Sequence, residues 1–225
     1  MPRLMFVLLT TLAMVVGGFV SGASALTEQE ELVEKARFVV LKLRDHPQHP
    51  DLRQTLAEAK GVLIVPRLIK AGFIFGGEGG SGVLLARGAD GSWSYPAFFT
   101  MGGGSFGLQI GAQWSQVMYV IMNDGGLTAI IDDQVTVGGE LSAALGGSGK
   151  GLAASTTTNL AADIFAYSLA EGAFIGASLE GAVINRRDDW NYYYYGDGAN
   201  AKSIVIEKQF KNPHADDLRG ALALF

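Results

Sequence analysis

The chain has 225 residues, of which 48% are hydrophobic and 17% are charged, and its formal net charge is −5. This length allows one sizeable hydrophobic core and does not call for two domains. A mildly acidic chain without a dense basic block argues against nucleic acid as a partner. Cysteine is absent, which excludes a disulfide framework, a thiolate metal site, a cysteine nucleophile and a lipid-modified cysteine.

The first 25 residues have the pattern of an export signal. One positive charge at Arg3 precedes an apolar run from Leu4 to Val20, and the small residues Ala23-Ser24-Ala25 follow. Signal peptidase accepts such a site, so we expect cleavage after Ala25 and a single domain over residues 26–225. An uncleaved anchor helix is the alternative, because the apolar run is close to the length that spans a bilayer. The expected location is a bacterial periplasm or cell envelope.

Two helices are predicted next. Thr27 and Glu30 form a capping-box pattern that opens a helix to about Arg44, with one apolar stripe at helical spacing. The stripe predicts packing on the core, and the alternative is that the helix lies on a membrane with Lys35 and Lys42 near lipid. A second short helix is expected from Asp51 to Lys60.

From Gly61 onward the pattern changes to short strands. The expected strands are separated by Gly, Pro and Asn-Asp turns, with one or two helical turns over residues 126–132. They are Val62–Val65, Val83–Leu85, Trp93–Met101, Phe106–Ile110, Val117–Met122, Val135–Leu145, Asp163–Leu169 and Phe174–Ile184. The 31 glycines lie within these apolar segments, which is typical of a tightly curved sheet. The predicted fold is therefore α+β, with a curled, largely antiparallel, barrel-like sheet and packed helices.

Several glycine motifs suggest enzymes but lack the required context. The G-x-G-x-x-G matches at residues 77–82 and 102–107 are followed by strand-like sequence, whereas a dinucleotide site needs a helix there. The phosphate-loop-like residues 146–151 lack the Ser or Thr that holds magnesium. Ser105 lies in a G-x-S-x-G pattern, which in a hydrolase is followed by a helix and accompanied by a histidine base. Here apolar residues alternate after Ser105, as in a strand, and His214 is the only histidine later in the sequence. We expect no catalytic residue, no cofactor and no metal.

Two groups of residues are candidates for ligand contact. Lys60, Arg67 and Lys70 flank an apolar strand, where they fit lipid phosphates or are simply charges at the rim. The run from Trp190 to Tyr195 suits a bilayer interface or a sugar-like ligand, with Tyr192 and Tyr195 as candidate contacts. The favoured interpretation of this run is structural, with some rings packed on the sheet.

Several blocks of the sequence, in order, resemble the SYLF domain family. They are Ala59–Pro66, Lys70–Phe73, Gly76–Leu84, Gly102–Gln113, Ala162–Ser168, Gly176–Ile184 and Tyr194–Gly196. Together they extend from about Leu52 to Tyr195, which is nearly the whole expected domain.

The resemblance implies a non-enzymatic lipid-binding protein. Eukaryotic relatives bind phosphoinositides through an N-terminal amphipathic helix and basic residues, and some bind actin filaments. Bacterial relatives are exported envelope proteins. The expected partner is a phospholipid or fatty-acyl ligand at a membrane surface, and the alternative is a protein-interaction or structural module of the envelope.

Overall fold

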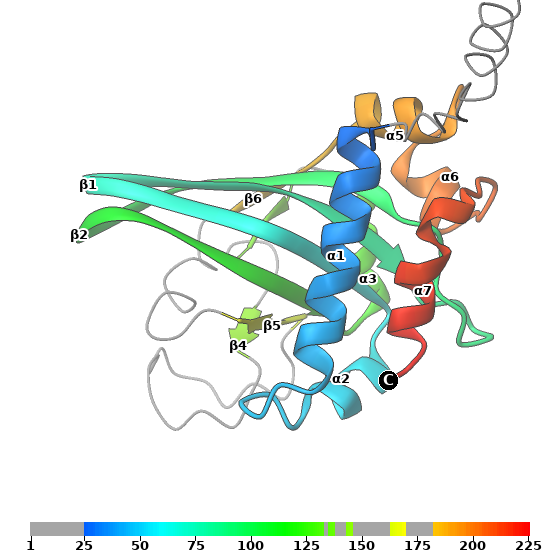
Figure 1. The fold of residues 1–225 in the computed structure, drawn as a ribbon, viewed down its shortest axis with the longest axis horizontal. Helices are drawn as coiled ribbons and strands as arrows, with labels where there is room; N and C mark the ends of the chain where they lie inside the picture. The colour runs from blue at the N-terminus through cyan, green and yellow to red at the C-terminus, as the bar shows by residue number, and fades with distance from the viewer. Residues whose placement is uncertain (1–24, 133–134, 138–142, 146–162, 170–181) are drawn as a thin grey trace, which may run out of the picture.

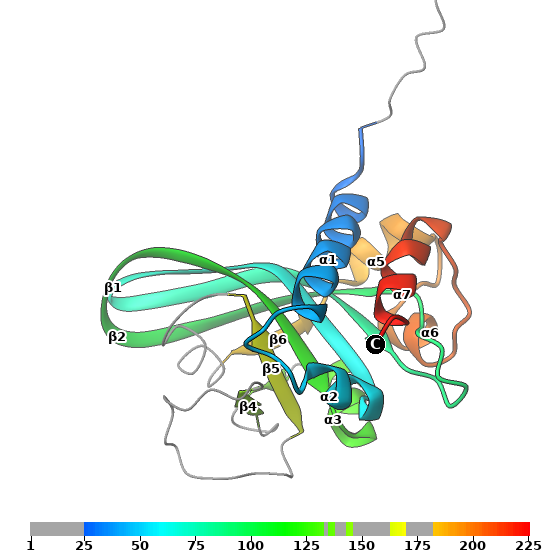
Figure 2. The same cartoon turned by 60° about the horizontal axis from the view of Figure 1, so that its bottom comes forward.

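The computed structural model describes residues 25–132, 135–137, 143–145, 163–169 and 182–225. Within these ranges, it describes only the backbone of residues 72–75, 105–112 and 143–145. The fold is α+β, as the sequence predicts. A strongly curled sheet forms one side of the molecule, and helices cover one of its faces and one of its ends (Figures 1 and 2). Along the described part of the chain, no helix has the length and apolar character needed to cross a membrane.

Helix α1, Glu28–Arg44, begins as predicted. The Thr27 side chain accepts a hydrogen bond from the backbone N–H of Glu30, and the Glu30 carboxylate accepts one from the backbone N–H of Thr27. This reciprocal capping box satisfies backbone donors that the first helical turn leaves free. Helix α2, Leu52–Glu58, is slightly shorter than expected and ends before the first strand.

A single long hairpin dominates the sheet. Strand β1, Gly61–Ala86, pairs antiparallel with β2, Ala97–Ile121, from Gly61 opposite Ile121 to Leu84 opposite Ala97. The register shifts between Val65 and Leu68 and again between Gly72 and Ile74. The several short strands predicted over residues 62–122 are therefore two long ones.

The hairpin curls back on itself (Figure 2), and the geometry of two glycines shows that two arms of β1 come into contact. A Cβ atom on Gly80 would lie 2.5 Å from the Arg67 carbonyl oxygen, and one on Gly82 would lie 2.7 Å from that of Ile64. Only glycine permits such a close approach of two backbones. We call this contact of Gly80 and Gly82 with residues 64–67 the seam.

Short strands complete the sheet on the free edge of β2. Strand β5, Ile164–Ser168, pairs antiparallel with its end at residues 117–121, and β6, Val183–Arg186, pairs antiparallel with residues 99–102. Strand β3, Val135–Thr136, pairs with β6, whereas β4, Ala143–Leu145, runs parallel to β5. The expected strands at 135–145 and 174–184 lie partly outside the described residues.

The remaining elements are helical and short. Helix α3, Asp124–Asp132, confirms the predicted helical turns. Helices α5, Asp188–Tyr195, and α6, Ala201–Val205, form in a region whose pattern is mixed, and a 3₁₀ turn, Pro213–Ala215, leads into α7, Asp216–Leu222. Helix α7 packs beside α1 (Figures 1 and 2).

The two faces of the sheet bury two separate apolar clusters. The inner face of the curl packs residues such as Leu63, Leu68, Phe99, Met101 and Tyr119 against one another, with contributions from α3 and α6. The outer face carries Val62, Ile64, Met118 and Val120, which pack against α1, α2 and α7. The apolar stripe of α1 is buried in this second cluster, so the stripe serves the core.

Candidate binding surface

The lysines of α1 lie on its exposed side and have polar partners. The Lys35 ammonium lies 2.6 Å from a Glu31 carboxylate oxygen, one turn earlier in the helix. The Lys42 ammonium donates to the side-chain oxygen of Gln116 in β2 at 3.1 Å. Lys42 therefore links α1 to the outer face of the long hairpin.

The three basic residues around the first strand do not gather on one surface. Lys60 lies at the start of β1, 3.9 Å from a carboxylate oxygen of Asp124. Arg67 is exposed within the irregular stretch between Val65 and Leu68. Lys70 is only 7% exposed and lies on the inner face of the curl. The structure therefore leaves Arg67 beside the outer face and separates it from Lys70.

The aromatic run forms helix α5, and most of its rings pack inward. Trp190 and Tyr194 contact the buried Phe98 ring edge to face, at centroid distances of 5.9 and 5.1 Å. The Tyr195 hydroxyl donates to the Pro96 carbonyl at 2.7 Å, and burial raises the pKa of this phenol. By contrast, Tyr192 and Tyr193 are 51% and 73% exposed.

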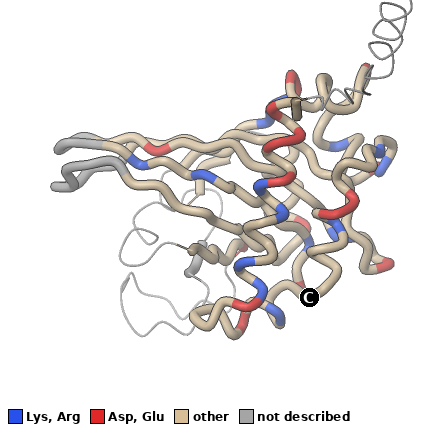
Figure 3. The backbone as a smooth tube through the Cα atoms, viewed as in Figure 1, with Lys and Arg blue, Asp and Glu red and all other residues tan. Residues whose placement is uncertain are grey.

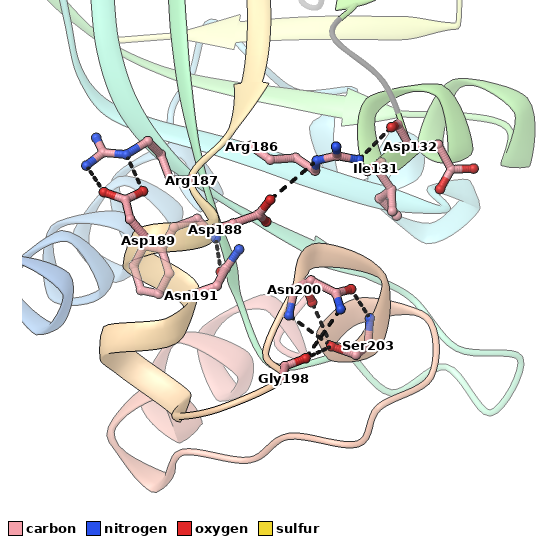
Figure 4. Close-up of polar contacts among 11 residues, drawn as sticks. Ile131, Asp132, Arg186, Arg187, Asp188, Asp189, Asn191, Gly198, Asn200 and Ser203 are labelled. Carbon is pink, nitrogen blue, oxygen red and sulfur yellow. Dashed lines mark hydrogen bonds and ion pairs between the residues drawn. The ribbon is translucent and has the colours of Figure 1, made fainter.

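Polar contacts fix the start of α5 against the sheet and α3 (Figure 4). Arg187 and Asp189 form a two-pronged ion pair with distances of 2.9 and 2.8 Å. The Arg186 guanidinium donates to the carbonyl oxygens of Ile131 and Asp132 at the end of α3. Asn191 is fully buried, and its side-chain oxygen accepts from the Phe98 backbone N–H at 2.9 Å.

The glycine motifs lie in strands. Ser105 is within β2 opposite Gly76, and both G-x-G-x-x-G matches fall within β1 and β2. A nucleophile elbow or a dinucleotide site needs a strand-to-helix turn at these positions. His214 contacts the Tyr194 hydroxyl at 3.3 Å in the 3₁₀ turn. The residues at 146–151 lie outside the described part, and no group of three or more metal-ligating side chains occurs within it.

An exposed aromatic and aliphatic pair on the outer face was not singled out by the sequence pattern. Ile69 and Trp114 are direct cross-strand partners, and they are 40% and 61% exposed. Gln116, which holds Lys42, follows Trp114 on the same face and lies opposite the stretch that contains Arg67. We call Lys42, Arg67, Ile69 and Trp114 the hairpin patch.

The hairpin patch combines apolar rings and chains with positive charge. Figure 3 shows that charged residues are sparse along the extended part of β1 and β2 and dense on the helices. Phe38, which is 51% exposed, lies one helical turn before Lys42 and extends the apolar surface toward α1. An indole beside an aliphatic side chain and two cations suits the interface between a bilayer and water.

Comparison with known proteins identifies the family. Residues 102–224 match the family described as "Ysc84: Las17-binding protein actin regulator". Over 166 residues, 72% of the chain, the sequence is 35% identical to Protein YSC84 of Saccharomyces cerevisiae, of which it covers 35%. It is equally similar to LAS seventeen-binding protein 3 of the same yeast. Over 189 residues, 84% of the chain, it is 31% identical to the human SH3 domain-containing YSC84-like protein 1, of which it covers 55%.

The chain spans about a third of the yeast relatives and about half of the human one. The family match nevertheless includes residues 102–121 of β2, with Trp114 among them, and the C-terminal helices α5, α6 and α7. The resemblance to the SYLF family is thereby confirmed, and the chain belongs to the Ysc84/SYLF domain family.

Proposed function

We propose that this protein binds the surface of an anionic phospholipid membrane through the hairpin patch. The Ysc84 family is one of binding proteins, and a non-enzymatic binding role fits the chain. The observation that carries the finer proposal is the exposed Ile69–Trp114 pair beside Arg67 and Lys42. An exposed tryptophan on a sparsely charged sheet face is costly in water, whereas its ring is stabilised at the headgroup level of a bilayer.

The basic residues supply the preference for anionic lipid. A Lys or Arg close to an anionic surface contributes about 1 kcal/mol. Loss of both Lys42 and Arg67 then reduces the free energy of membrane binding by about 2 kcal/mol, which weakens partition of the protein onto anionic vesicles about 30-fold. The Ile69 and Trp114 side chains contribute through apolar burial, so their removal weakens binding without changing the dependence on lipid charge.

Vesicle flotation tests this proposal. The protein is floated with vesicles of phosphatidylcholine alone and with vesicles that contain phosphatidylglycerol, at low and high salt. We expect binding to the anionic vesicles that falls with salt, and loss of binding in Lys42→Ala/Arg67→Ala and in Ile69→Ala/Trp114→Ala. A matched control is Lys202→Ala/Lys208→Ala, which removes two exposed lysines from the C-terminal region. Equal flotation of all variants would disprove the proposal.

We further propose that residues 1–25 direct export and are removed, so that the protein acts in a periplasm or cell envelope. The support is the charge at Arg3, the apolar run and the Ala23-Ser24-Ala25 site. Intact-mass analysis of the protein from an envelope fraction tests this. A chain that starts at Leu26 is the expected product, and one that retains Met1–Ala25 contradicts cleavage.

A protein partner is the second candidate function. The specific observation is that Tyr192 and Tyr193 project from α5 with their rings 5.7 Å apart and largely exposed. Tyrosine is enriched at interfaces between proteins, and one relative is named as a binding protein for LAS seventeen. Cross-linking in cells with Tyr192→Ala/Tyr193→Ala separates this function from lipid binding, because those changes leave the hairpin patch intact.

A further inference from the structure

Two residues of opposite charge, one on each arm of β1, interact electrostatically across the curl. Lys70 lies before the glycine-rich bend and Glu78 lies after it, and both are on the inner face. Lys70 is 7% exposed, and the Oε2 atom of Glu78 is buried without a hydrogen-bond partner among the described residues. A carboxylate oxygen in such a place lacks the solvation that its charge requires.

The electrostatics of Glu78 follow from this position. Burial raises the pKa of Glu78 from 4.5 to about 7, and the opposing attraction of Lys70 offsets only part of that effect. Tyr119 of β2 is fully buried nearby, and the charge of Glu78 adds to the burial that raises the pKa of its phenol. Lys70 and Tyr119 are thus both coupled electrostatically to Glu78.

The carboxyl group adjoins the seam. Glu78 is two residues before Gly80 on the same inner face, and Gly80 touches the backbone of Arg67 on the other arm. Glu78 therefore lies next to the place where the backbones of the two arms are in direct contact. A change that draws water to its carboxyl group acts on this contact. Beyond the seam, the inner face is apolar and includes Leu68 and Met101.

We propose that Glu78 is a proton-controlled gate of the curled hairpin. With the carboxyl group protonated, the arms stay closed along the seam; with the carboxylate ionised, the arms separate until water reaches it. Lys70 moderates this response by stabilising the ionised form inside the closed curl. The inner face of the hairpin is then more accessible at pH 8 than at pH 6.

The direction and size of the response follow from linkage. A carboxyl group whose pKa is higher in the closed form binds protons more strongly there, so closure is favoured below about pH 7 and weakened as the pH rises through that value. If opening restores the ordinary value of 4.5, the ratio of open to closed molecules rises up to about tenfold between pH 6 and pH 8. Incomplete solvation of the opened carboxylate makes the rise smaller.

Distance measurement between spin labels on the two arms tests the gate. The chain contains no cysteine, so labels attach only at introduced sites, here Arg67→Cys on one arm and Gly104→Cys on the other. Both positions are exposed, and a Cβ atom at Gly104 has no neighbour within 4 Å. Electron–electron resonance then reports the distribution of distances between the labels at pH 6 and pH 8, and circular dichroism verifies that each variant is folded.

The expected result is a longer-distance population that grows from pH 6 to pH 8 in the labelled parent. Glu78→Gln keeps the short distance at both values, because its side chain does not ionise. Lys70→Met moves the midpoint of the change to higher pH, because the attraction that lowers the pKa of Glu78 is lost. Glu58→Gln, at an exposed position in α2, behaves as the parent. A distance that does not change with pH in the parent, or the same change in Glu78→Gln, overturns the proposal.

Discussion

The close approach at Gly80 makes a quantitative prediction about the seam. Alanine at this position places its Cβ 2.5 Å from the Arg67 carbonyl oxygen and 2.9 Å from a Val65 methyl carbon. The first neighbour is backbone, so relief requires the two arms of β1 to move apart. Overpacking of this kind costs about 1–3 kcal/mol, which lowers the Tm of a chain this size by roughly 2–12 °C.

The matched control for Gly80→Ala is Gly104→Ala. Both glycines lie in the curled hairpin, but an added Cβ at Gly104 has no neighbour within 4 Å. Gly104→Ala reduces only the conformational entropy of the unfolded chain. We expect it to leave the folded state equally stable or to stabilise it by about 0.4–1 kcal/mol. Urea unfolding and differential scanning calorimetry measure both variants. Equal stability of Gly80→Ala and Gly104→Ala would show that the arms do not meet as described.

Two further pairs of substitutions test the packing around the sheet. Leu43→Ala removes a side chain of α1 with no exposed surface and should cost about 2–5 kcal/mol, whereas Phe38→Ala on the exposed side of the same helix should cost far less; chemical denaturation compares them. Asn191→Ala leaves the buried N–H of Phe98 without its acceptor and should cost about 1–3 kcal/mol. Asn191→Asp keeps an acceptor oxygen for this N–H. Hydrogen exchange that is fast at the Phe98 amide in Asn191→Ala and slow again in Asn191→Asp would confirm the role of the hydrogen bond.

Local signals were enough to predict α1. Its capping box and apolar stripe are contained within eighteen consecutive residues, and the tertiary contacts agree with them. The hairpin is different, because glycine and proline usually interrupt strands. Pro66 is accommodated where the register shifts, and three glycines of the bend, at positions 72, 77 and 79, are paired with glycines of the opposite strand. The length of β1 and β2 therefore depends on pairing between distant segments.

The same irregularity explains why the basic residues separate. Strict alternation from the inward-facing Val65 would place Lys70 outward and Ile69 inward. The extra residue between Val65 and Leu68 reverses this order, so Lys70 is buried on the inner face and Ile69 is exposed. A bulge of this kind re-aims every side chain that follows it, and its position is not visible in the alternation of the sequence. The pairing of Ile69 with Trp114 could not be predicted for the same reason.

The C-terminal helices also depend on tertiary contacts. Four tyrosines in a row favour a strand by propensity, but the rings of Tyr194 and Trp190 find a packing site on Phe98 when the segment is helical. Helix α7 has only seven residues and contains Gly220. Such a short helix is marginal alone, and its contact with α1 stabilises it.

Fluorescence of Trp114 in the presence of vesicles tests membrane binding most directly. The chain has three tryptophans, so replacing Trp93 and Trp190 by Phe leaves Trp114 as the sole one. If the hairpin patch enters the bilayer interface, anionic vesicles shift the emission to shorter wavelength and brominated lipid chains quench it. If the protein floats with the vesicles but Trp114 keeps the emission of a water-exposed indole, the membrane contact lies elsewhere. That result would contradict the proposed function.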